Sequence, residues 1–257
     1  MIKASDARRA RCAEVVMMKK ERLAFLDLEY GQIYGSYRRD LVPVEIGAVL
    51  WDGIGAPIFE SKKIYLDCDL VMRKNIIDRL GNTIGVSERV ANNARNEYTK
   101  RFDPSFELDE EAVRDIRKNV AYRSFHMLNG HVARILNDHN PTRLVFFSAS
   151  QDLYILNKAR VNLQGHELVD LQEEVVGALS LKNMMSLDRA SRLIGFKTNW
   201  RYIRSENYTY PVPEKCRNFI KPHKAVGDAA RIFLLYREFH EDKEEFLRRS
   251  MEIMNAK

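Results

Sequence analysis

Residues 23–31, LAFLDLEYG, join an apolar run to two carboxylates, Asp27 and Glu29. The run contains no glycine or proline and predicts a central strand that is buried on both faces. In a strand, residues i and i+2 lie on the same face, so the two carboxylates are expected side by side, where their charges repel each other. Two interpretations follow: an ordinary solvated strand end, or a cleft in which cations lie among the acids.

Further strand and helix signals follow this segment. Strands are predicted at 22–29, 42–53 and 57–66, and an Asp-Gly turn indicates an antiparallel hairpin between the last two. Short apolar runs predict strands at 143–147 and 166–171, and periodic spacing predicts helices at 109–138, 183–194, 223–239 and 241–257. A hairpin followed by alternating strands and helices predicts a mixed α/β sheet with helices on both faces, whereas residues 197–221 are expected to form a long loop.

Composition limits the class of protein. The 257 residues suit one large domain. Because the sequence has no long apolar run and its N-terminus has no apolar signal core, we expect neither a membrane span nor a secretory signal. The cysteines Cys12, Cys68 and Cys216 are odd in number and form no C-x-x-C pair, so we expect a cytoplasmic protein without a zinc site. The net charge of +6 is compatible with a polyanionic partner.

Three more ionisable residues stand at the ends of predicted elements. Asp152 follows the strand at 143–147 near the start of a helix, and Asp228 lies in HKAVGDA among small alanines. His223 follows Pro222, which suits the entry of the helix that carries Asp228. Taken singly, each fits an ordinary residue at a helix start. Taken with Asp27 and Glu29, they indicate a shared site.

The segments LAFLDLEYG, VPVEIGAVLWD, SQDLYIL and HKAVGDA occur in this order, and together they resemble the motifs of the DEDDh-type 3′–5′ exonucleases of the DnaQ-like superfamily. The resemblance implies a ribonuclease H-like mixed five-stranded sheet flanked by helices over residues 22–240, with a mostly helical insertion at 67–108. A basic extension (1–21) and a C-terminal helix (241–257) flank this domain. Ser148-Ala149 and Tyr30 depart from the family pattern, so the family's substrate contacts there are not carried over.

The resemblance also implies roles for the site residues. Asp27, Glu29, Asp152 and Asp228 would hold two divalent ions, Mg²⁺ or Mn²⁺, which would also relieve the repulsion between the carboxylates. His223 would accept a proton from the attacking water. The expected reaction releases nucleoside 5′-monophosphates from the 3′ end of single-stranded DNA or RNA.

Residues 189–224 contain nine Lys or Arg against two acids, with aromatic residues interleaved. This composition is typical of single-strand binders, although a solvated loop with aromatics in the core fits it equally well. The candidate nucleic-acid contacts are Tyr30, Trp200, Arg201, Arg204 and Lys224.

Two other functions stay open beside the exonuclease: a nucleic-acid-binding or scaffold protein on a retained nuclease fold, and a hydrolase of very short oligonucleotides. The sequence also leaves open DNA or RNA as substrate, and a homodimer or a protein partner.

Overall fold

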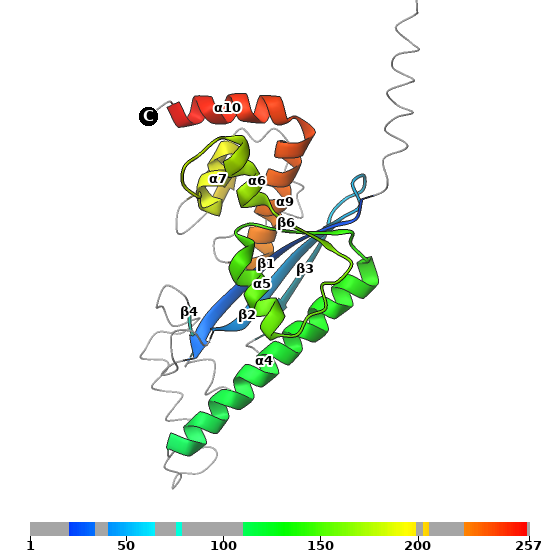
Figure 1. Ribbon diagram of the computed structural model, residues 1–257, viewed down its shortest axis with the longest axis vertical. Coiled ribbons are helices and arrows are strands. Elements are labelled where there is room, and N and C mark those ends of the chain that lie inside the picture. Colours follow the sequence, from blue (N-terminus) through cyan, green and yellow to red (C-terminus); the bar gives the residue numbers. More distant parts are fainter. Residues whose placement is uncertain are drawn as a thin grey trace, which may run out of the picture.

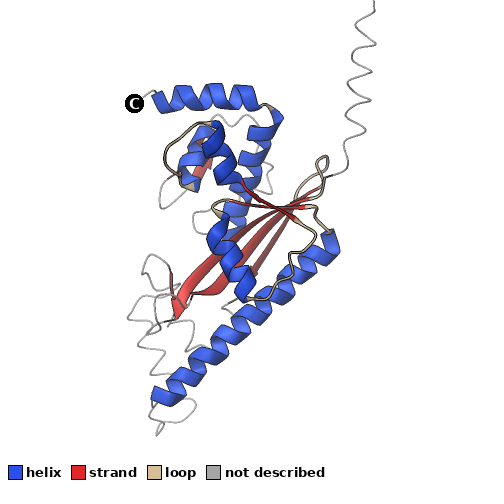
Figure 2. Cartoon of the chain, in the orientation of Figure 1, coloured by secondary structure: helices blue, strands red, loops and turns tan. Residues whose placement is uncertain are grey.

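The computed structural model describes residues 21–33, 41–64, 76–78, 110–198, 203–205 and 224–255. Side chains are described for 21–30, 41–64, 121–196 and 224–255. Over these residues the chain forms a mixed β-sheet with helices on both faces, as Figures 1 and 2 show. The predicted α/β class is therefore confirmed.

Five strands form the path of the main sheet, in the order β3-β2-β1-β5-β6. The strands β1 (Leu23–Ile33), β2 (Leu41–Trp51) and β3 (Ile58–Lys63) pair antiparallel. The strands β5 (Arg143–Phe146) and β6 (Glu167–Asp170) continue the sheet in parallel to β1. The predicted five-stranded mixed sheet is confirmed, and β1 stands at its centre, as its apolar run indicates.

A short strand, β4 (Ile76–Asp78), pairs antiparallel with the far end of β1. It is the described part of the segment 67–108, which the sequence suggested was a mostly helical insertion. The remainder of that segment lies outside the described residues.

One face of the sheet is covered by α4 (Glu110–His139) and α5 (Ala149–Lys158). Even-numbered residues of β1, such as Leu26 and Leu28, pack there against Leu128 and Val132 of α4. The amide of Asn129 donates hydrogen bonds to the carbonyls of Ala159 (3.0 Å) and Arg160 (2.8 Å), which fixes α4 to the end of α5.

The opposite face is covered by α9 (Ala225–Glu241), together with α6 (Leu171–Ala178) and α7 (Leu187–Leu193). Phe25 of β1 makes edge-to-face contacts with Phe233 and Tyr236 of α9, each with 5.2 Å between ring centroids. The last helix, α10 (Lys243–Asn255), adds Phe246 to this core. Odd-numbered residues of β1, Asp27 and Glu29 included, therefore face α9.

Residues 197–221 were expected to form a long loop, and this was wrong at its start. Phe196–Thr198 (β7) and Ile203–Ser205 (β8) pair as a small antiparallel hairpin. Strands of three residues are too short to show the alternation from which a strand is predicted.

Gly47 allows α9 to lie directly on the sheet. It is the cross-strand partner of Asp27 in the pairing of β1 with β2. A Cβ at this position would overlap the backbone nitrogen of Val226 and the carbonyl group of Ala225, at the start of α9. Since any side chain would hold α9 away, the glycine sets the distance between the first turn of α9 and Asp27.

Replacing Gly47 by alanine should force the start of α9 away from β2 and lower the free energy of unfolding by about 3 kcal/mol, the upper range for overpacked cores. Chemical denaturation measures the change. Gly130→Ala is the control: nothing lies within 4 Å of its added Cβ, and in a helix the alanine should stabilise by roughly 0.5–1 kcal/mol. Equal stability of Gly47→Ala and the unmodified protein would show that this contact does not set the position of α9.

Candidate functional site

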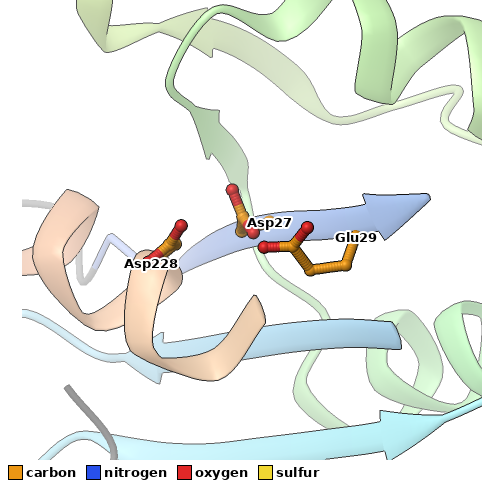
Figure 3. Close-up of side chains that lie close together, drawn as sticks. All are labelled: Asp27, Glu29 and Asp228. Carbon is orange, nitrogen blue, oxygen red and sulfur yellow. The ribbon is translucent and has the colours of Figure 1, made fainter. Parts of the chain in front are cut away.

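Three predicted site residues meet between β1 and α9. Asp27 and Glu29 project from β1, and Asp228 projects toward them from the first turn of α9 (Figure 3). One carboxylate oxygen of each lies within 4.8 Å of the others, and all three residues are half-buried. We call Asp27, Glu29 and Asp228 the carboxylate cluster.

Asp152, the fourth predicted acid, lies close to this cluster. It occupies the first turn of α5, which follows the end of β5, and it is buried. Its negative charge acts on Asp27 strongly enough to raise the pKa of Asp27. The four carboxylates predicted from the sequence thus form one electrostatic group, drawn from three separate elements.

The protonation of Asp27 reflects this crowding. Burial raises the pKa of Asp27 well above its ordinary value, and the charges of Asp228, Asp152 and Glu29 raise it further, in that order. Arg231 opposes them. The charged form of Asp27 is therefore costly in the protein without a bound cation.

Arg231 joins Asp228 to α7 and was not foreseen from the sequence. Its guanidinium is almost fully buried and donates to Asp228 Oδ1 (2.7 Å) and to Asp188 Oδ1 (2.6 Å). Burial alone would lower the pKa of Arg231, but the two carboxylates more than offset it, so its pKa is raised. The i, i+3 spacing from Asp228 is a signal that could have suggested this pair.

Glu45 and Lys224 border the cluster on β2 and at the entry of α9. Glu45 pairs in register with Glu29 and is buried. It accepts a hydrogen bond from Ser61 Oγ (3.4 Å), and Lys224 Nζ lies 3.8 Å from its Oε2. The Lys224 side chain is 45% exposed, so its ammonium is accessible beside the carboxylates. The role predicted for Lys224 from the sequence, a nucleic-acid contact, stays a prediction.

Asp170, at the end of β6, shapes the turn that leads to Asp152. It accepts hydrogen bonds from the backbone N–H groups of Ser148 (3.0 Å) and Ala149 (2.7 Å), and it also caps α6 through Gln172 N (3.0 Å). Ser148 has a left-handed backbone (φ 62°), which these bonds stabilise. An aspartate directly before a helix predicts the cap on α6, but nothing in the sequence points to its bonds with Ser148 and Ala149.

Tyr30 does not belong to this site, so its interpretation as a nucleic-acid contact is corrected. It is 9% exposed and packs in the core between the sheet and α4, together with Ile46 and Leu128. The reason is strand alternation: Tyr30 follows Glu29 directly and therefore points to the opposite face.

Four other predicted residues remain untested. His223, Trp200 and Arg201 lie outside the described residues, and for Arg204 in β8 the structure describes only the backbone. Their proposed roles stay predictions from the sequence.

Comparisons with known proteins add no family assignment. No family model matches the sequence, and no curated protein matches it. Within the part of the chain that the structure describes, no helix is both long and apolar enough to span a membrane.

The oxygen-only composition of the carboxylate cluster determines which ions it suits. Carboxylates are the ligands that hard divalent cations such as Mg²⁺ and Mn²⁺ prefer. A cation among these oxygens would offset the repulsion that raises the pKa of Asp27. The cluster is therefore chemically fit to hold such an ion.

Two substitutions in the cluster should affect the stability of the metal-free protein in opposite directions. The raised pKa means that the stability linked to Asp27 is present at acid pH and is lost as pH rises through that pKa. At neutral pH, Asp27→Asn should therefore maintain or raise the free energy of unfolding. Asp228→Ala should lower it by about 3 kcal/mol, because Arg231 loses a partner while buried.

Denaturation in the presence of a chelator measures both effects. A loss of stability in Asp27→Asn as large as in Asp228→Ala would show that Asp27 is not under electrostatic strain.

Proposed function

We propose that the chain is a metal-dependent 3′–5′ exonuclease that releases nucleoside 5′-monophosphates from the 3′ end of a single-stranded nucleic acid. The observation that carries this proposal is the meeting of Asp27, Glu29 and Asp228 within 4.8 Å, with Asp152 beside them. The sheet has the strand order β3-β2-β1-β5-β6, in which β3, β2 and β1 pair antiparallel and β5 and β6 run parallel to β1. This order is compatible with a ribonuclease H-like arrangement and further supports the proposal.

The energetics of the cluster favour an enzyme over a scaffold. Half-buried carboxylates whose charges raise the pKa of Asp27 destabilise the fold unless a bound group offsets their repulsion. In a binding protein without metal, neutral residues at these positions would be more stable. The intact set of acids is explained most simply by a cation that they bind.

In this proposal Asp27, Glu29 and Asp228 would hold the divalent ion, and Asp152 would add negative charge beside it. When bound, divalent ions supply charge stabilisation for the attacked phosphate and make water a stronger nucleophile. Lys224, whose ammonium lies at the edge of the cluster, would contact a phosphate of the strand. His223, on the resemblance to DEDDh enzymes, would accept the proton of the attacking water.

A time course on end-labelled single-stranded DNA, RNA and a dinucleotide, each with Mg²⁺ or Mn²⁺, tests the reaction. The unmodified protein should shorten the polymers stepwise from the 3′ end, and a chelator should stop it. Asp27→Asn should lose the activity while keeping its fold. Hydrolysis of the dinucleotide alone would establish the short-oligonucleotide hydrolase instead, and an inactive protein that binds the strands would establish the scaffold.

His223→Ala should lower turnover by roughly 10²–10⁴-fold, which is the usual contribution of a general base. Metal binding, measured by calorimetry, should persist because the carboxylates supply the ligands. The acid limb of the pH–rate profile should also lose the ionisation of His223.

His240→Ala is the control histidine substitution, because His240 stands in the last turn of α9 and pairs with Glu174. It should keep normal turnover. Normal turnover in His223→Ala as well would remove His223 from the mechanism.

A further inference from the structure

A face built by α4 and α5 combines exposed rings with cations. Its members are Tyr122, Arg123, Phe125 and His126 of α4, Tyr154 and Lys158 of α5, and Arg160 just after α5. We call these residues the α4–α5 face. Tyr122 is 71% exposed and Tyr154 is 45% exposed. Both rings are therefore accessible to a ligand.

The rings of this face are held in place. Tyr122 and His126 stack on one turn of α4, with 6.1 Å between ring centroids and 5° between their planes. Lys158 Nζ lies 5.4 Å from the ring centroids of both Phe125 and Tyr154, and so joins α4 to α5. The hydrogen bonds of Asn129 to the carbonyls of Ala159 and Arg160 hold the end of α5 against α4 (Figure 1). Ordered rings lose little entropy when a base stacks on them.

The charge of the α4–α5 face is positive. Arg123, Lys158 and Arg160 are exposed, and within the described residues none of the three forms an ion pair with a carboxylate. Residues 121–136 of α4 contain no acid, and the acid in α5, Asp152, is buried at its start. Exposed cations without neighbouring carboxylates are complementary to phosphates, and exposed rings are complementary to bases.

The helix α5 connects this face to the carboxylate cluster. Asp152 stands in its first turn beside the cluster, and Lys158 is its last residue. At 1.5 Å per residue, the two lie about 9 Å apart along the helix. A strand that ends at the cluster and follows α5 would bring its upstream bases to the rings.

We propose that the α4–α5 face binds the single strand upstream of its 3′ end, with bases stacked on Tyr122 and Tyr154 and phosphates near Arg123 and Lys158. This rests on the proposed exonuclease function for the position of the 3′ end. Stacking and charge do not distinguish one base from another. The strand is therefore bound with little dependence on its sequence.

Binding is measured by fluorescence anisotropy with a labelled oligothymidine of about twelve nucleotides in the presence of a chelator, so that hydrolysis plays no part. The double variant Tyr122→Ala, Tyr154→Ala should weaken binding by about 10- to 100-fold. The double variant Tyr122→Phe, Tyr154→Phe keeps the rings and should bind normally. Unchanged affinity of the alanine pair, with its fold verified by circular dichroism, would overturn the proposal.

Lys158→Ala should reduce the slope of log affinity against log salt by about one, since one phosphate contact is lost. Lys243→Ala is the matched control, because Lys243 also stands over a ring, that of Phe239, but on α10. It should leave the slope unchanged. The same slope in both variants would exclude Lys158 as a phosphate contact and overturn that part of the proposal.

Hydrolysis of a chromogenic thymidine 5′-phosphate ester separates the two proposals. This small substrate does not extend to the α4–α5 face, so the alanine pair should hydrolyse it at the normal rate while Asp27→Asn should not. If the unmodified protein hydrolyses no substrate, the exonuclease function is wrong, and the anisotropy still decides whether the face binds a strand.

Discussion

The close contact between the first turn of α9 and Gly47 is the constraint on which the site depends. Asp27 and Glu29 are neighbours by strand geometry alone, but Asp228 reaches them only because the backbone of Ala225 and Val226 lies directly on β2. Ala229 and Ala230 continue this approach with small buried side chains. Packing brings the carboxylates together against their electrostatic repulsion, since apolar burial along α9 is large and their mutual repulsion is not large enough to separate the elements.

The charged residues around the cluster differ in burial and in role. Arg231 is buried and ties Asp228 to Asp188, so it acts as a fixed internal cation. Lys224 is half-exposed beside Glu45 and stays accessible to an incoming phosphate. Asp170 fixes the turn ahead of Asp152 through two backbone hydrogen bonds. Asp228 and the turn before Asp152 are therefore fixed by separate interactions.

The individual strands and the long helix α4 could be predicted from sequence, because each depends on a local pattern, whereas the meeting of the acids was expected only from the resemblance to the DEDDh exonucleases. Apolar periodicity predicted 109–138 as a helix, and α4 spans Glu110–His139. Strand alternation, applied one residue further, would also have placed Tyr30 in the core. The links of Arg231 to Asp188 and of Asp170 to Ser148 could not be predicted, because they join residues from elements whose contact depends on the complete fold. The α4–α5 face was missed for the same reason: Lys158 meets Phe125 only after two helices pack.

The mixed pairing of β1 also determines when in folding the site can form. β1 pairs antiparallel with β2 through a short connection, whereas its parallel pairing with β5 joins Leu23 to Arg143, and α9 arrives later still in the chain. Contacts between segments distant in sequence have a larger entropy cost of loop closure, so they form more slowly than local contacts. Repulsion between Asp228 and the acids of β1 therefore opposes the late docking of α9. A cation that binds the docked state would slow its undocking, so the ion would contribute to the kinetic persistence of the fold as well as to chemistry.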